Sequence, residues 1–388
     1  MNIPPEVQAC RDEVIFLRRH FHADPELGLH EYRTAQYIED YLKGLDLEPR
    51  RCTPTGIVAD LQGGKSAKTL LLRCDIDALP VQEETGLAFA SRNPGVMHAC
   101  GHDAHIAMML MTAKLLCARK EKLCGNVRFV FQPNEEDAGA ERMISAGVLE
   151  PTRPSACGGY HIWSPIPTGK IGVAAGPLMA SSWYFKLTIT GRGGHGGSPH
   201  TAINPIDAAG HVLEAIKTLC ALEFNALRPT VISVCKIHAG SKEIIVPDVA
   251  ELEGSIRCLH GDDEHVRARF AEVTEQVCRA FRCTRELEFV CGNTLLNNDE
   301  ALTNILIHAA AEIVGRDNIL TSGISVMLGD DFAEFSRRVP GVYYFLGTAN
   351  PDKHSGFEHH NARFQIDEES LLIGVAVQLA FVQEYLSK

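Results

Sequence analysis

Residues 104–132 read AHIAMMLMTAKLLCARKEKLCGNVRFVFQ, and this stretch decides the class of fold. Its first part is an apolar segment of helical length, and its last part, NVRFVFQ, is a mostly apolar run typical of a strand buried on both faces. Similar runs stand upstream, TLLLRCDID (69–77), and downstream, ACGGYHIW (156–163). Because strands alternate with helices, the sequence predicts an α/β fold with a mostly parallel sheet.

The pattern changes near residue 181, where SSWYFKLTITG alternates apolar and polar residues as a half-exposed antiparallel strand does. Strands and helices then follow in the order β-α-β-β-α-β, which is ferredoxin-like. A chain of 388 residues exceeds the size at which one core stops growing, so two domains are expected. We predict one domain from residues 1–180 and 294–388 and an inserted α+β domain over residues 181–293.

Composition narrows the classes of function. The net charge of −12 argues against nucleic acid or an anionic membrane as the main partner. The first residues lack a secretory signal pattern, and no window appears apolar enough to span a membrane. The 13 cysteines are scattered and odd in number. We therefore expect a cytoplasmic enzyme with free thiols and no membrane segment.

Acids and histidines follow the predicted strands. Asp75 and Asp77 end TLLLRCDID, the pair Glu135-Glu136 follows NVRFVFQPN, and His161 ends GGYH. His359 and His360 lie after VYYFLGT. The carboxyl edge of such a sheet is where α/β folds place their sites, so these groups are expected to meet there.

The stretch MHACGHDAH (97–105) permits three interpretations. Cys100 and His102 are two apart before a helix, and thiolate, imidazole and carboxylate together are a normal ligand set for a divalent ion. Alternatively, Cys100 is a nucleophile with His98 or His102 as its base, or the stretch is polar without a function. The Glu135-Glu136 pair favours the metal, because one acid can ligate it while the other takes a proton from metal-bound water.

Asp77 also has two interpretations. It can hold a ligand histidine by the second ring nitrogen, as metal sites normally require. It can equally cap the turn that follows it.

Taken together, these motifs resemble the M20 metallopeptidases, in particular the amidohydrolase branch. That branch includes hippurate hydrolases, N-acyl-amino-acid amidohydrolases and plant hydrolases of indole-acetyl amino acids. The resemblance runs over nearly the whole chain, through LRRHFHADPELGLHEYRTA, MHACGHDAHIAMML, FQPNEEDAGA, GRGGHGGSPHTAINPIDAA and FQIDEESL.

The resemblance implies a site for two divalent ions, with zinc, manganese, cobalt and nickel all compatible. Cys100 matches the ligand that bridges both ions, and Glu135 matches the general base. The remaining ligands match His102, Glu136, His161 and His360. The register of His360-Asn361-Ala362-Arg363-Phe364 excludes His359, and His98, His105 and His200 match no ligand position.

The inserted domain would be a lid and dimerisation domain. Its His195 matches a histidine that reaches the partner subunit's site and steadies the oxyanion. Ile244 stands where an asparagine thought to contact substrate is common, which leaves substrate preference open. Arg257 could hold a substrate carboxylate or be a solvated charge. Other departures are Asp330 in place of glutamate in Glu-Asp-Phe and Ala362 in place of a common proline.

The expected function is metal-dependent hydrolysis of the amide bond of a small N-acyl amino acid by a homodimer. Two alternatives stay open. One is an exopeptidase or dipeptidase with the same metal site, and the other is a catalytically silent homologue that binds a ligand.

Overall fold

A computed structural model describes residues 1–64 and 68–388. The chain forms two compact units, the first from residues 1–178, 297–325 and 330–388 and the second from residues 179–296 and 326–329. The short segment 326–329 packs with the second unit although it is distant from the rest of that unit in sequence.

The first unit is built on a mixed, mostly parallel sheet in the order β1-β2-β4-β3-β5-β16-β6-β15. The pairs β3–β4, β3–β5, β5–β16 and β6–β15 are parallel, whereas the pairs β1–β2, β2–β4 and β16–β6 are antiparallel. The strands are β1 (Arg50–Arg51), β2 (Ile57–Leu61), β3 (Thr69–Asp75), β4 (Asn126–Gln132), β5 (Ala156–Pro167), β6 (Ile171–Gly172), β15 (Ile319–Leu320) and β16 (Gly341–Ala349).

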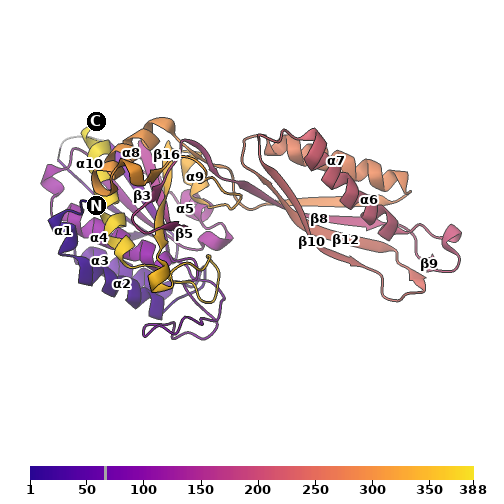
Figure 1. Cartoon of the computed structure of the whole chain (residues 1–388), viewed down its shortest axis with the longest axis horizontal. Coiled ribbons are helices and arrows are strands. Elements are labelled where there is room, and N and C mark those ends of the chain that lie inside the picture. The colour runs from indigo at the N-terminus through magenta and orange to yellow at the C-terminus, as the bar shows by residue number, and fades with distance from the viewer. Residues whose placement is uncertain (65–67) are drawn as a thin grey trace. The chain divides into compact units, whose positions relative to one another are not determined.

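The central strands are buried on both faces. Every residue of β3 is buried, and so is every residue of β4 except Asn126. This is why their sequences are almost continuously apolar and do not alternate. Figure 1 shows the sheet within a shell of helices. These helices are α1 (Pro5–Gln8), α2 (Arg11–Ala23), α3 (Tyr32–Lys43), α4 (His102–Cys117), α5 (Ala140–Ser145), α8 (Glu300–Val314), α9 (Phe332–Ser336) and α10 (Glu369–Ser387).

Helix α10 is, by length and composition alone, apolar enough to cross a membrane. However, 78% of its most apolar window is buried inside the structure. It packs against α8 and α4, so its apolar character is that of a core helix.

The second unit has the predicted ferredoxin-like order. Its sheet is antiparallel in the order β10-β12-β8-β13, and Figure 1 shows α6 and α7 together on one face. The elements are β8 (Ser181–Thr190), α6 (Pro205–Thr218), β10 (Thr230–Ala239), β12 (Val249–Cys258), α7 (Asp263–Ala280) and β13 (Thr284–Cys291). Alternate residues of β8, such as Phe185, Leu187 and Ile189, point into the core beneath the helices.

Two short two-stranded sheets complete the strands. β9 (Gly194–His195) pairs with β11 (Ile245–Val246), and β7 (Gly176–Met179) pairs with β14 (Leu296–Asn298). All 13 cysteines lie in the described part of the chain and all are free thiols.

Candidate metal centre

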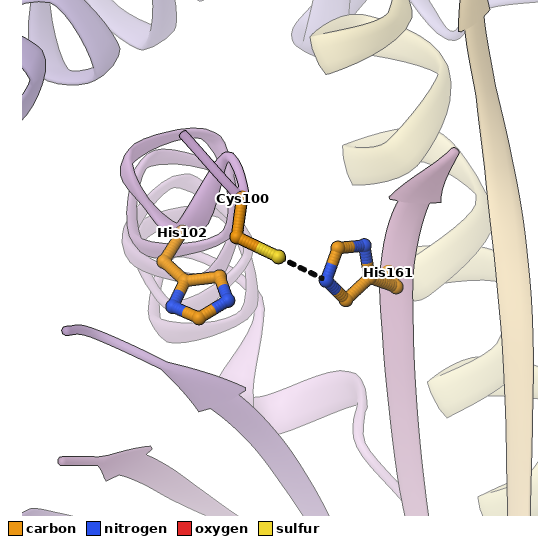
Figure 2. Close-up of side chains that lie close together, drawn as sticks. All are labelled: Cys100, His102 and His161. Carbon is orange, nitrogen blue, oxygen red and sulfur yellow. Dashed lines mark hydrogen bonds between the residues drawn. The ribbon is translucent and has the colours of Figure 1, made fainter. Parts of the chain in front are cut away.

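Cys100 and His102 lie on either side of Gly101, at the start of α4. Gly101 has a φ of +86°, and a Cβ there would lie 2.1 Å from the Ile162 side chain. Both facts require a glycine at this turn. The turn lets the two side chains leave the helix end next to one another (Figure 2).

His161 approaches Cys100 from β5. Its Nε2 lies 3.4 Å from the Cys100 Sγ (Figure 2), and its Nδ1 is 2.5 Å from the Ile162 carbonyl oxygen. Because Nδ1–H donates to that carbonyl, Nε2 keeps its lone pair for an acceptor role. Burial, reinforced by neighbouring histidines, lowers the pKa of His161 well below its usual value and keeps the ring neutral. The sequence suggested that His161 ends its strand. Because β5 continues to Pro167, His161 instead lies within the strand.

His102 is oriented by Asp77. Its Nδ1 lies 2.9 Å from the Asp77 carbonyl oxygen and 3.2 Å from Asp77 Oδ1. The other nitrogen, Nε2, is buried without a hydrogen-bond partner. Burial lowers the pKa of His102, but Asp75 and Asp77 outweigh it and raise that pKa to about 10. The pocket therefore attracts positive charge at the unpartnered nitrogen.

Glu136 and His360 complete the cluster. Glu136 Oε1 is buried and lies 3.3 Å from His360 Nε2. The backbone N–H of Glu136 donates to Asp77 Oδ2 at 3.1 Å, so Asp77 contacts both His102 and the glutamate turn. The backbone N–H of His360 donates to the Ala99 carbonyl at 2.8 Å, which ties the late loop to the Cys100 turn.

The five predicted ligands fall into two groups that share Cys100. One group is Cys100, His102 and His161, and the other is Cys100, Glu136 and His360; within each group the ligand atoms lie within 4.8 Å of one another. Thiolate, imidazole and carboxylate are donors that divalent transition ions accept. Among the described residues, His102 Nε2 has no hydrogen-bond partner, which fits the same interpretation. The residues present therefore suit two divalent ions.

Glu135 lies beside this cluster, and it is buried. Burial raises its pKa well above the usual range, and Asp330, Glu136 and Asp331 raise it further, against the opposing effect of Arg73. A buried carboxyl group with a perturbed pKa beside such a cluster is a candidate for proton transfer.

The electrostatics disfavour a cysteine nucleophile. Burial raises the pKa of Cys100 well above its usual value, and Glu136, Glu135 and Asp75 raise it further. The reactive form of cysteine is the thiolate, which such surroundings suppress unless a cation is bound. The metal interpretation of this stretch is the better supported one.

Three other histidines of the first unit have different surroundings. His105 Nδ1 is 2.5 Å from Asp75 Oδ1, and its Nε2 accepts the Ile162 N–H at 2.9 Å, so both ring nitrogens are occupied. His359 Nε2 donates to the Ile162 carbonyl at 3.0 Å, and the side chain is packed among aromatic rings. His98 is buried and neither nitrogen has a hydrogen-bond partner.

The predicted substrate residues lie in the second unit. His195 is exposed, and its Nδ1 accepts the Gly197 N–H at 3.0 Å, which leaves Nε2 as the donor. Ile244 is 50% exposed, next to the β9–β11 pair that contains His195. Arg257 donates from Nη1 to the Met327 carbonyl at 3.0 Å, so part of its guanidinium is already engaged. The metal-ligand candidates all belong to the first unit.

Sequence reasoning missed Arg73. It is fully buried in β3, and its guanidinium contacts Asp75 and Asp331 at 2.7 Å and Asp330 at 3.4 Å. The signal was present, because an arginine inside the apolar run TLLLRCD implies buried anionic partners. Arg73 thus links the strand that carries Asp75 to the segment before α9.

Comparisons with known proteins identify the family of this chain. Residues 71–384 match Peptidase family M20/M25/M40. "Thermostable carboxypeptidase 1" of Saccharolobus solfataricus is 36% identical, over 99% of this chain and 98% of that protein. "N-acetyl-L-cysteine deacetylase" of Bacillus subtilis is 35% identical over 95% of this chain and 87% of its own. "N-acyl-L-amino acid amidohydrolase" of Geobacillus stearothermophilus is 38% identical over 76% and 80%.

A solved structure is also similar over its whole length. It is a dinuclear metal-binding peptidase of the M20 family from Bacillus subtilis, 32% identical, with a TM-score of 0.85, and the alignment covers 98% of this chain and 99% of that one. Fold, site and relatives together define a metallo-hydrolase that acts on amides. The chain belongs to the M20/M25/M40 peptidase family.

Proposed function

We propose that this protein hydrolyses the amide bond of N-acyl amino acids with two bound divalent cations, releasing a carboxylic acid and a free amino acid. The observation that carries the proposal is the pair of ligand groups sharing Cys100, with the buried acid Glu135 beside them. Cys100, His102, His161, Glu136 and His360 would hold the cations, which would supply Lewis acidity toward a substrate carbonyl.

When bound, the cations polarise the substrate carbonyl and make water a better nucleophile. Glu135 takes the proton from the attacking water and returns it to the nitrogen of the leaving amine. Asp77 contacts His102 at Nδ1, which would leave Nε2 available to a cation. Burial raises the pKa of Glu135 well above its usual range.

The second unit would serve as a lid. We propose that the Nε2–H of His195 donates to the oxyanion that forms on the substrate carbonyl, and that Arg257 uses its remaining N–H groups to hold the substrate carboxylate. Ile244, beside His195, would present an apolar surface to the substrate.

We further propose that the working form is a homodimer through the second unit, in which His195 acts on the partner subunit. Strand β10 is at the edge of its sheet, and Val231 and Ile237 on it are exposed, as are Leu222 and Leu227 nearby in sequence. An exposed apolar edge strand is a natural surface for a second copy.

Mixing two inactive variants tests that arrangement. Glu135→Gln and His195→Ala subunits, exchanged at equal amounts, should regain about a quarter of wild-type activity, because half the dimers are mixed and each has one competent site. Each variant incubated alone is the control. A mixture that stays inactive after proven subunit exchange would show that His195 does not act across subunits.

The substrate class is supported by the relatives named for N-acyl amino acids. An exopeptidase is the second candidate, because a relative of similar identity is named a carboxypeptidase. The release of free amino groups from a panel of N-acyl amino acids and dipeptides separates the two. Manganese- or zinc-loaded protein should act on the acylated amino acids, and preferential cleavage of dipeptides would reject that substrate class.

A chelated sample and Glu135→Gln test for a silent homologue. We expect the variant to keep its metal by elemental analysis but to lose about 10²- to 10⁴-fold in kcat, the usual contribution of a general base. Equal turnover by the variant and the wild type would remove Glu135 from the mechanism. We place the reaction in the cytoplasm, where thiols such as Cys100 stay reduced.

A further inference from the structure

The turn between β4 and α5 carries both glutamates of the site, and its backbone is unusual. Asn134 and Ala138 have positive φ values of 56° and 59°. Neither residue is a glycine, and L-residues rarely adopt this left-handed conformation, so it persists where surrounding contacts support it. The turn also closes on itself, through the Gly139 N–H and the Asn134 carbonyl at 2.7 Å.

Asp331 holds both ends of this turn. The Gln132 Nε2, before the turn, donates to both Asp331 oxygens at 2.8 Å. The Ala140 N–H, after the turn, donates to Asp331 Oδ2 at 2.8 Å. Asp331 is fully buried, so water does not compete for these hydrogen bonds.

Glu31 holds the middle of the turn. Its Oε1 accepts the Asn134 N–H at 2.9 Å, immediately before Glu135. Glu31 is fully buried. The same segment approaches very closely, because a Cβ on Gly28 would lie 2.2 Å from Asn134 Oδ1. The loop before α3 therefore supports the left-handed residue that precedes the general base.

Glu135, Asp330 and Asp331 bring their carboxylates within 4.8 Å of one another, as a cation site would. Arg73 already supplies a cation there, 2.7 Å from Asp331 and 3.4 Å from Asp330. The Asp331 oxygens also accept hydrogen bonds from Gln132 and Ala140. These contacts are more consistent with a role of Asp331 in fixing the backbone geometry of the turn than with a role as a metal ligand.

We propose that Glu31 and Asp331 are positioning residues that clamp the turn 132–140 and thereby fix the directions of Glu135 and Glu136. The two come from distant parts of the chain, before α3 and before α9, and they grip the turn at its middle and at its ends. The inference rests on the proposed metal-dependent hydrolysis and extends it to residues that touch neither metal nor substrate.

The test compares Glu31→Ala, Glu31→Gln and Glu26→Ala. The alanine removes the acceptor for the Asn134 N–H, whereas the glutamine keeps an oxygen in its place. Glu26 is the matched control, because its carboxylate accepts from Thr34 in the same segment and makes no hydrogen bond to the turn among the described residues. Each variant is measured for kcat, KM and the visible absorption of its cobalt(II)-loaded form, which reports coordination geometry independently of turnover.

We expect Glu31→Ala to lower kcat by about 10- to 100-fold and to change the cobalt spectrum at saturating metal, the usual effect of losing a residue that supports a ligand. Glu31→Gln should recover to within a few-fold of wild type in both readouts, and Glu26→Ala should match wild type. Asp331→Asn, which keeps one acceptor oxygen but loses the charge facing Arg73, should show the same spectral change as Glu31→Ala.

Wild-type protein is measured first. Wild type that neither binds cobalt nor hydrolyses any panel member would reject the proposed function and the clamp with it. Active, cobalt-binding wild type beside a folded Glu31→Ala with unchanged kcat and spectrum would reject the clamp alone. Equal losses in Glu31→Ala and Glu26→Ala would also reject it, because the cause would then be general damage to α3.

Discussion

Replacing Glu31 with glutamine should change how stability depends on pH. Burial raises the pKa of this carboxyl from its ordinary value of 4.5 to about 7, and Asp77 contributes in the same direction. The folded state therefore binds the proton more tightly than the unfolded state does. The stability from that proton is fully present below pH 4.5 and is lost as the pH rises through about 7.

The size of the effect follows from the shift. Each pKa unit corresponds to 1.36 kcal/mol, so a shift from 4.5 to about 7 amounts to about 3 kcal/mol. Glutamine occupies the same volume, accepts the same Asn134 N–H and does not titrate. Relative to wild type, Glu31→Gln should gain about 3 kcal/mol between pH 4 and pH 8, mostly between pH 4.5 and 7.

Urea unfolding of chelated protein measures this difference at a series of pH values. The chain has only two tryptophans, Trp163 in the first unit and Trp183 in the second, so a Trp183→Phe background makes fluorescence report the unit that contains Glu31. The background is the same in both proteins, and its own effect cancels in the difference. A difference that stays flat from pH 4 to pH 8 would refute the assignment of Glu31 as a buried acid that is neutral at low pH.

Four further outcomes are expected. Arg73→Met should destabilise the first unit by about 3–5 kcal/mol, because three buried carboxylates lose their cation; thermal unfolding of the chelated variant checks this. His195→Ala should lower kcat by about 10²- to 10³-fold, the cost of an oxyanion donor, and a decrease below twofold would contradict that role. Arg257→Met should raise KM with kcat nearly unchanged if the side chain only binds substrate, which steady-state kinetics with and without a substrate carboxylate resolves. Adding zinc or manganese at 100 times its Kd should stabilise the chelated protein by about 2.7 kcal/mol for each occupied site, and Cys100→Ser should shift that response to higher metal concentration.

Much of the architecture could be predicted from local pattern. Continuous apolar runs predicted strands buried on both faces, and β3 and β4 are buried almost throughout. Alternation predicted the half-exposed β8, which packs one face against α6 and α7. Such patterns can be recognised in the sequence alone, because the periodicities of strands and helices depend on residues that are neighbours in the chain.

The candidate ligands were predictable for a related reason. Cys100 and His102 are close in sequence, and the other donors follow strands whose ends converge. The choice of His360 over its neighbour came from a resemblance in register. The structure adds a physical reason for choosing His360. His359 Nε2 donates to the Ile162 carbonyl, whereas His360 lies 3.3 Å from Glu136.

The sequence by itself thus determined the order of the strands and helices and the kinds of donor atoms available to a metal. Only the tertiary structure decided what holds those donors in place. Arg73 meets Asp331 across 258 residues, and Glu31 meets the Asn134 N–H across 103. No rule of sequence spacing links such partners, because their contacts depend on how the packed elements bring buried groups together. A buried charge or N–H group needs a partner, and the fold determines which residue provides it.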